Sequence, residues 1–207
     1  MNKVFFIADS HFGHENIIRY EQRIWRTVEE MDDAMIELWN RQVDAEDDVY
    51  VLGDLCHCSL KHAQECLCRL NGKLHLIRGN HDLREAAYER YFTEVCDYKE
   101  LPLEKVLGSA GTSGDARTPK TPETSGTPED HDERLLILSH YFMPFFHQCR
   151  KGAIHLYGHT HNTPAYEEEE KFKRSMCSRG MSGEAYNIGA LYLEYKPQPL
   201  DWILKNR

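Results

Sequence analysis

Short apolar runs that each end in a cluster of polar residues recur along this chain, and they restrict its fold more than any other feature. Five of these runs span residues 4–8, 49–52, 74–78, 135–139 and 154–157, and a weaker sixth spans residues 186–194. Apolar runs of about four to eight residues that are bounded in this way are typical of buried β-strands. We therefore expect a sheet built from these segments.

Helical patterns lie between several of the predicted strands. Thr27 and Glu30 have the spacing of a capping box, and apolar residues follow on one face of a predicted helix. Ser59 precedes a second predicted helix over residues 60–70, and a third is predicted over residues 83–92. Strands that alternate with helices predict an α/β fold in which helices pack on the faces of a sheet.

Two segments follow neither pattern. Residues 108–133 consist mainly of Gly, Ser, Thr, Pro and acidic residues, with almost no large apolar side chain. Such a segment buries too little apolar surface to fold alone, so we expect a flexible surface insertion within one domain that spans residues 1–207. Residues 167–183 begin with four acidic residues and then become basic, and we expect a solvated loop there.

The charge balance restricts the partners of the protein. The chain has 34 acidic and 25 basic residues, which gives a net charge of −9. A surface of this sign repels extended duplex nucleic acid and anionic membranes. It does not exclude a small phosphate ester or a nucleotide as substrate, because bound divalent cations reverse the field locally. No apolar run approaches the length of about 20 residues that spans a bilayer, so we expect a soluble cytoplasmic protein whose oligomeric state the sequence leaves open.

The seven cysteines fit a reducing compartment, in which they remain free thiols. Four of them form two pairs with one residue between the members of each pair: Cys56, Cys58, Cys66 and Cys68. One interpretation is a zinc site, since thiolates are good zinc ligands, although zinc sites usually have two or more residues between paired cysteines. The other interpretation, favoured by the helical pattern of residues 60–70, is that these cysteines are small buried hydrophobic residues.

The polar clusters that follow the predicted strands carry the chemistry. They are Asp9-Ser10-His11, Gly53-Asp54, Gly79-Asn80-His81-Asp82, Ser139-His140 and Gly158-His159-Thr160-His161. In α/β sheets ligands gather at the carboxyl ends of strands, so the five clusters are expected to converge. Their carboxylates, amide oxygen and imidazoles suit manganese, iron, zinc or nickel rather than calcium. Because these side chains are too many for one ion, the set predicts two ions about 3.5–4 Å apart, an arrangement that hydrolyses phosphate esters.

The ordered set of clusters resembles the five sequence blocks of the calcineurin-like metallophosphoesterase superfamily. The most specific blocks are Gly79-Asn80-His81-Asp82 and Gly158-His159-Thr160-His161. Residues 9–18 and 76–82 resemble, more narrowly, a small bacterial and phage group of uncharacterised predicted phosphoesterases. The resemblance implies a four-layer α-β-β-α sandwich of two mixed sheets flanked by helices.

The resemblance also implies a role for each residue of a binuclear metal centre. One ion is expected to be bound by Asp9, His11 and His161, and the other by Asn80, His140 and His159. Asp54 is expected to bridge both ions, with manganese as the first expectation and iron, zinc or nickel as alternatives. His81 is expected to stabilise the transition state or protonate the leaving oxygen, and Asp82 to orient His81.

The function implied is metal-dependent hydrolysis of a phosphate ester, with a phosphodiester preferred because Leu55 stands where protein phosphatases have the arginine of an Asp-Arg-Gly element. A phosphomonoesterase and a non-catalytic metal-binding scaffold of the same fold are the alternatives. His14 is expected either to contact the substrate phosphate or to lie at the start of a helix, and Arg78 either to pair with a phosphate or to lie on a strand surface. Six other histidines are interpreted as structural: His57, His62, His75, His131, His147 and His155.

Overall fold

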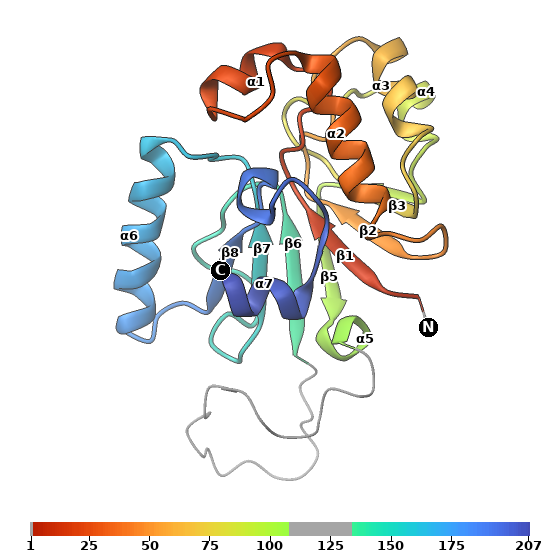
Figure 1. Cartoon of the computed structure of the whole chain (residues 1–207). Coiled ribbons are helices and arrows are strands. Elements are labelled where there is room, and N and C mark those ends of the chain that lie inside the picture. The colour runs from red at the N-terminus through yellow and green to blue at the C-terminus, as the bar shows by residue number, and fades with distance from the viewer. Residues whose placement is uncertain (1, 108–133) are drawn as a thin grey trace.

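The computed structural model of the protein describes residues 2–107 and 134–207. The predicted insertion over residues 108–133 lies outside the described residues. In the described part, two β-sheets and the helices around them form the layers shown in Figure 1.

The first sheet has five strands in the order β4-β3-β2-β1-β9. Its strands are β1 (Val4–Ile7), β2 (Asp48–Val51), β3 (Lys73–Ile77), β4 (Glu94–Cys96) and β9 (Gln198–Pro199). Strands β1 to β4 run parallel, with Phe5 opposite Val49 and Val49 opposite Leu74, whereas β9 runs antiparallel to β1. The parallel strands end at the same edge of the sheet, so the polar residues that follow them are neighbours.

The second sheet has four strands in the order β5-β6-β7-β8. Its strands are β5 (Tyr98–Pro102), β6 (Leu135–Ser139), β7 (Ile154–Tyr157) and β8 (Glu184–Asn187). Strand β5 is antiparallel to β6, and β6, β7 and β8 are parallel. Both sheets are therefore mixed, as predicted.

The two sheets share one hydrophobic core. Leu136 and Leu138 of β6 belong to the same buried cluster as Phe6 of β1, whereas Ile137, between them in sequence, packs against Phe146 on the other face of β6. This alternation is what a strand between two layers requires. The predicted α/β fold, with two mixed sheets flanked by helices, is confirmed.

Helices lie outside both sheets. They are α1 (Glu15–Tyr20), α2 (Val28–Asn40), α3 (Leu60–Leu67), α4 (Ala86–Glu89), α5 (Leu103–Leu107), α6 (Pro164–Ser178) and α7 (Leu200–Asn206), with a 3₁₀ turn η1 (Ala190–Leu193). Figure 1 shows α2 and α3 on the side of the first sheet and α6 beside the second sheet, at the opposite side of the molecule. None of the helices within residues 2–107 and 134–207 combines the length and the apolar composition that crossing a membrane requires.

The first two predicted helices are present and begin where the sequence places them. The Thr27 side chain accepts a hydrogen bond from the Glu30 backbone N–H, and the Ser59 side chain accepts one from the His62 N–H. The third prediction, a helix over residues 83–92, is wrong in length, because only the turn of α4 is helical. Glu85 remains extended at φ −115° and ψ 134°, which holds the preceding segment out of the helix.

The solvated loop predicted over residues 167–183 is wrong, since most of this segment belongs to α6. Pro164 occupies the first helical turn, where its missing N–H leaves no hydrogen bond unmade. Glu168 pairs with Lys171, and Glu170 with Lys173, each three residues apart on the helix surface. The acidic and basic residues that indicated a loop are thus the paired charges of a helix face.

The predicted strand over residues 186–194 is only partly a strand. Strand β8 ends at Asn187, and the 3₁₀ turn η1 follows it. Strands β4, β5 and β9 were not predicted, because polar residues interrupt each of them and none contains a run of apolar residues.

Candidate metal centre

The expected site residues occupy strained backbone positions directly after the strands. Asp9, His11, Asp54, His159 and His161 all have positive φ angles, of 54°, 54°, 53°, 76° and 47°. Each costs about 1–2 kcal/mol for a residue with a side chain. Backbone hydrogen bonds between neighbouring loops compensate: the Asp9 N–H donates to Gly53 O at 3.0 Å and the His11 N–H to Asp54 O at 3.0 Å. Strain concentrated in this way is typical of functional sites.

Glycines allow the loops to approach one another closely. A β-carbon added at Gly79 would lie 2.1 Å from Asp54 Oδ1, and one at Gly158 would lie 2.5 Å from Asp9 Oδ2. Both distances are far below van der Waals contact. The glycines that precede Asn80 and His159 are therefore needed to seat the two carboxylates.

Three of the expected ligands form one compact group, namely Asp9, His11 and His161, whose ligand atoms all lie within 4.8 Å of one another. His11 Nε2 is 3.3 Å from His161 Nε2. Asp9 is fully buried, and its Oδ2 accepts a hydrogen bond from the His159 N–H at 2.8 Å. Its Oδ1 has no hydrogen-bond partner among the described residues. Burial raises the pKa of Asp9 to about 6, although His161 and His140 act against this rise.

A second group contains Asp54, His140 and His159, again within 4.8 Å of one another. Asn80 adjoins this group, with its Oδ1 3.2 Å from His140 Nε2. The Oδ2 of Asp54 lies 3.6 Å from His140 Nε2 and 3.8 Å from His11 Nε2. The Asp54 carboxylate therefore lies between the two groups, and all seven expected ligand residues lie in one cluster.

Hydrogen bonds to the remaining ring nitrogens orient two of the histidines. His140 Nδ1 lies 2.8 Å from the backbone oxygen of Leu52. A carbonyl only accepts hydrogen bonds, so Nδ1 carries the proton, and the lone pair of Nε2 faces Asn80 and Asp54. This is the tautomer that a metal ligand requires.

His161 is oriented in the same way by Glu21, a residue that the sequence interpretation missed. Glu21 Oε1 lies 2.5 Å from His161 Nδ1. Burial lowers the pKa of His161, but the hydrogen bond with Glu21 and the charge of Asp9 outweigh it, so the pKa is raised.

Arg23 holds Glu21 in place and was also missed. Its Nε donates to Glu21 Oε2 at 2.7 Å, and its two terminal nitrogens donate to Ser10 O at 2.8 Å and Asp9 O at 3.1 Å. Burial raises the pKa of Glu21, but the hydrogen bond with His161 and the charge of Arg23 bring it below the usual value. Glu21 and Arg23 both lie in the turn that follows α1, and neither belongs to a recognisable sequence motif.

His81 lies beside a layer of further imidazoles. Its ring stacks on that of His57 with centroids 4.1 Å apart, and His57 lies 4.2 Å from the ring of His14. His11, His14 and His57 form another group that could hold a metal ion. Burial, followed by the proximity of His57, lowers the pKa of His14 to about 4. The prediction that His57 has only a structural role is therefore incomplete, because its ring lies against those of His81 and His11.

Asp82 contacts the loops rather than the His81 ring. Its carboxylate accepts hydrogen bonds from the backbone N–H groups of Gly79, Asp54 and Leu55, at 2.8, 2.8 and 3.1 Å. A further bond comes from the Tyr88 hydroxyl. Within the described residues no hydrogen bond joins Asp82 to the ring of His81. Asp82 thus fastens the loop after β3 to the loop after β2.

Arg78 has carboxylate partners of its own. Its guanidinium lies 2.6 Å from Glu89 Oε1 and 3.7 Å from Asp97 Oδ1. These contacts hold the end of β3 to α4 and to the residue after β4. The expected contact of Arg78 with a phosphate stays a prediction.

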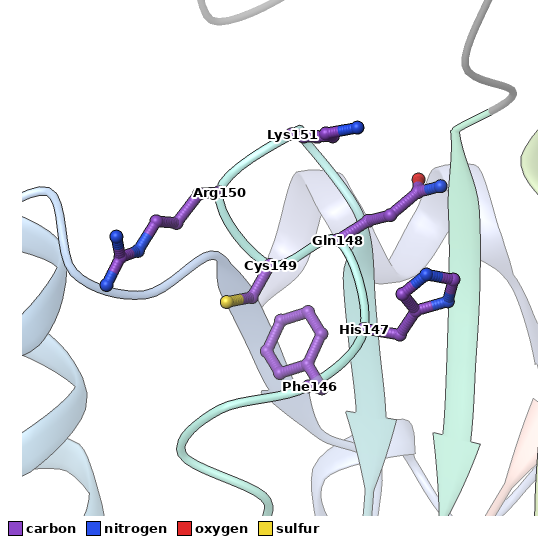
Figure 2. Close-up of a pocket in the computed structure, with 6 residues that line it drawn as sticks. All are labelled: Phe146, His147, Gln148, Cys149, Arg150 and Lys151. Carbon is purple, nitrogen blue, oxygen red and sulfur yellow. The ribbon is translucent and has the colours of Figure 1, made fainter.

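A separate surface hollow of about 400 Å³ lies in the loop between β6 and β7 and is lined by Phe146, His147, Gln148, Cys149, Arg150 and Lys151. Figure 2 shows Arg150 pointing away from His147 and Gln148, so the polar groups of this loop do not converge. Binding sites usually have a few convergent polar groups. None of the six residues belongs to the metal-binding groups, and we therefore place the function at the histidine cluster.

Comparison with known proteins agrees with this geometry. A family model described as "Calcineurin-like phosphoesterase" matches residues 2–174. The chain belongs to this family. The grouped histidines and aspartates are candidate ligands for divalent metal ions, in keeping with this family.

This calcineurin-like phosphoesterase is similar to proteins of Methanocaldococcus jannaschii and of Mycobacterium phages. The uncharacterized protein MJ1445 of Methanocaldococcus jannaschii is 48% identical over 84 residues, which are 40% of this chain and 48% of that protein. The chain thus spans about half the length of this relative. The Gene 66 protein of Mycobacterium phage D29 is 29% identical over 183 residues, with 78% of this chain and 80% of that protein covered. These matches agree with the predicted resemblance to a bacterial and phage group.

One solved structure has the same fold. The crystal structure of a protein of unknown function, AQ665, from Aquifex aeolicus superposes with a TM-score of 0.65 at 21% sequence identity and covers 99% of both chains. At this identity the likeness shows the fold alone.

The residues of the centre fit divalent metal ions. The unpartnered Oδ1 of buried Asp9 needs a positive partner, because a buried carboxylate oxygen without one is costly. The fixed tautomers of His140 and His161 present a lone pair to the cluster rather than an N–H group. Oxygen and imidazole donors together suit transition metals.

Proposed function

We propose that this protein is a binuclear metallophosphoesterase that hydrolyses a small phosphodiester. In this proposal one ion is held by Asp9, His11 and His161, and the other by Asn80, His140 and His159. Asp54 bridges them. The observation that carries the proposal is the place of Asp54 Oδ2 between the two groups, 3.8 Å from His11 Nε2 and 3.6 Å from His140 Nε2.

His81 and Asp82 have different roles around these ions. When bound, two such ions supply an activated water and neutralise charge on the phosphoryl oxygens. His81, whose backbone N–H is fixed by Asp54 Oδ1 at 2.9 Å, is placed to donate a proton to the leaving oxygen. Asp82 acts as a positioning residue, because it holds together the loops that carry Asp54 and His81.

His14 and His57 extend this arrangement toward the substrate. The His57 ring stacks on that of His81, the His14 ring lies tilted beside that of His57, and both residues are only partly buried. Neutral imidazoles offer N–H groups that hydrogen-bond to phosphate oxygens without a fixed charge. We assign these two histidines to substrate binding.

The preference for a diester rests on the absence of a cationic residue after Asp54. Leu55 occupies that position and is fully buried, so it offers no charge for a terminal phosphate dianion. A phosphodiester carries one negative charge fewer than a phosphomonoester and needs less compensation. The net charge of −9 further favours a small substrate, such as a nucleotide, over extended duplex nucleic acid. We take manganese as the first metal to test.

The test is hydrolysis of bis-p-nitrophenyl phosphate and of p-nitrophenyl phosphate by protein stripped with a chelator, before and after manganese is added. We expect manganese-dependent release of p-nitrophenol from the diester, and loss of that release in Asp54→Asn. Glu29→Gln, a substitution on the exposed side of α2, is the matched control and should leave the rate unchanged.

Each other outcome contradicts part of the proposal. Release from the monoester alone would make the protein a phosphomonoesterase. No release from either substrate, with two equivalents of metal bound, would favour a non-catalytic metal-binding scaffold. Equal rates for Asp54→Asn and the unsubstituted protein would remove the binuclear centre from the reaction.

A further inference from the structure

A second cluster of potential metal ligands lies between α2 and α3, outside the centre described above. It consists of Asp32, His62 and Cys66, whose ligand atoms all lie within 4.8 Å of one another. Asp32 comes from α2, whereas His62 and Cys66 are four residues apart on α3 and share one face of that helix. None of the three belongs to the phosphoesterase centre.

The distances in this cluster are close to those of a four-coordinate zinc site. Asp32 Oδ2 lies 2.7 Å from His62 Nε2 and 3.8 Å from Cys66 Sγ. Ligands placed tetrahedrally around zinc at the usual bond lengths are separated by about 3.3–3.6 Å. These two distances would have to change by about 0.2–0.6 Å to reach those separations, and His62 Nε2 lies within 4.8 Å of Cys66 Sγ.

Burial and access also suit a bound ion. Asp32 and Cys66 are both buried, so a shared cation would be shielded from water on that side. The His62 side chain is 33% exposed, which leaves a path by which an ion can enter. Thiolates, imidazole nitrogens and carboxylate oxygens are all ligands that zinc accepts in proteins.

We propose that Asp32, His62 and Cys66 bind one zinc ion, with Cys58 as the fourth ligand. A β-carbon added at Gly13 would lie 2.7 Å from Cys58 Sγ and 2.9 Å from His62 Cδ2, so both side chains approach the same point of the chain at Gly13. Cys58 Sγ is not among the ligand atoms that lie within 4.8 Å of one another, so the Cys58 side chain has to turn toward the ion to bind it. Each coordinating thiol gives its proton to solvent as the ion binds.

This site differs from the four-cysteine site that the sequence suggested. Cys56 is buried next to Cys58, and Cys68 is exposed, with its Sγ 3.3 Å from Glu65 O. Neither lies in the cluster. The packing of α2 against α3 instead brings His62 and Asp32 next to Cys66, although Asp32 lies 34 residues before Cys66 in sequence.

The ion would fasten the loop that carries His11. Both oxygens of Asp32 accept the Gly13 N–H, each at 3.1 Å, and Gly13 lies two residues after His11. The same loop pairs with the next one through the bridge between Phe12 and Cys56. Zinc at Asp32 would therefore hold α2, α3 and this loop together. This role is structural, and the ion would take no part in hydrolysis.

The experiment is loading of the full chain with cobalt(II), which replaces zinc and gives a near-ultraviolet charge-transfer band only when a thiolate binds it. The residues assigned to the phosphoesterase centre supply nitrogen and oxygen alone, so the band reports this cluster independently of hydrolysis. We expect the band in the unsubstituted chain, its loss in Cys66→Ser, and its retention in the matched control Cys68→Ser. Cys58→Ser should lower its intensity to about half, since one of two thiolates is removed.

Zinc content gives a second measurement. We expect three equivalents of zinc per chain after dialysis and two in Cys66→Ser. His62→Gln, at a partly exposed position on α3, should also hold two equivalents, which keeps the test decisive if Cys66→Ser fails to fold. Absence of the band in the cobalt-saturated chain, or its persistence in Cys66→Ser, would overturn the site. A band of full intensity in Cys58→Ser would overturn the assignment of the fourth ligand.

Discussion

The Nδ1 atom of His161 lies 2.5 Å from Oε1 of Glu21, although 140 residues separate them in the chain. Glu21 is in turn held by the buried guanidinium of Arg23, which also donates to the backbone oxygens of Ser10 and Asp9. The ring of one proposed ligand and the backbone of another are therefore fixed by the same pair of residues. This link makes Glu21 a positioning residue for the metal centre.

Glu21→Gln should weaken metal binding about 10- to 100-fold, because an amide fixes the orientation of His161 less firmly and makes its ring less basic. The measurement is manganese affinity in competition with a chelator, with Glu29→Gln as the exposed control. Urea unfolding of the metal-free variant shows whether Arg23, which loses its charged partner, still lies in a folded protein. Unchanged affinity in a folded Glu21→Gln protein would contradict the role assigned to Glu21.

His81→Asn should lower kcat on the diester by about 10²- to 10⁴-fold, the usual contribution of a positioned proton donor. Manganese affinity should stay the same, because His81 is not among the proposed ligands. His147→Asn, at an exposed position in the loop after β6, is the control. Undiminished hydrolysis in His81→Asn would remove the residue from the reaction, and a parallel loss of metal would make it a ligand instead.

Gly79→Ala should abolish hydrolysis and weaken metal binding, because the new β-carbon would lie 2.1 Å from Asp54 Oδ1 and displace the bridging carboxylate. Gly180→Ala is the matched control. Gly180 has φ +63°, so alanine is strained there, but no atom lies within 4 Å of the added carbon. Full activity in Gly79→Ala would show that the carboxylate is not held in the close position described here.

His155 should make the protein less stable in acid. Its Nε2 lies 2.9 Å from Ser139 Oγ, which itself donates to Tyr141 O, so Nε2 carries the proton. The Nδ1 is buried and has no partner among the described residues. Burial, assisted by the charge of Lys173, lowers the pKa of His155 to about 3.

The lowered pKa of His155 decides the direction in which stability changes with pH. The unfolded chain binds a proton at His155 below its ordinary value near 6.5, whereas the folded chain stays neutral down to about 3. Stability is therefore fully present above the unfolded pKa and is lost as the pH falls below it. Between about pH 7.5 and about pH 5.5 the loss from this group should be about 1.4 kcal/mol.

Urea unfolding of chelated protein at the two pH values measures this effect. His155→Gln keeps an N–H donor for Ser139 but does not titrate. Between about pH 7.5 and about pH 5.5 it should lose about 1.4 kcal/mol less stability than the unsubstituted protein. Equal pH dependence in the two proteins would show that His155 is protonated in the folded state.

Much of the fold follows from local sequence. The apolar runs of β1, β2, β3, β6 and β7 are long enough to be predicted, and the caps at Thr27 and Ser59 locate α2 and α3. The cap oxygens and apolar faces act over only a few residues, so they can be read directly from the sequence. Helix α6 was missed because its charges give the same composition as a loop, and only their pairing across one turn distinguishes the two.

The sequence by itself determined which residues end the parallel strands, and hence that Asp9, Asp54, Asn80, His140, His159 and His161 would meet. Topology explains this, since parallel strands present their carboxyl ends at one edge. Only the tertiary structure decided which side chains support them: Glu21 and Arg23 behind His161, His57 against His81, and Asp32 beside His62 and Cys66. These contacts join residues from different elements with no fixed spacing in sequence. They depend on packing distances of a few ångströms, which no local pattern encodes.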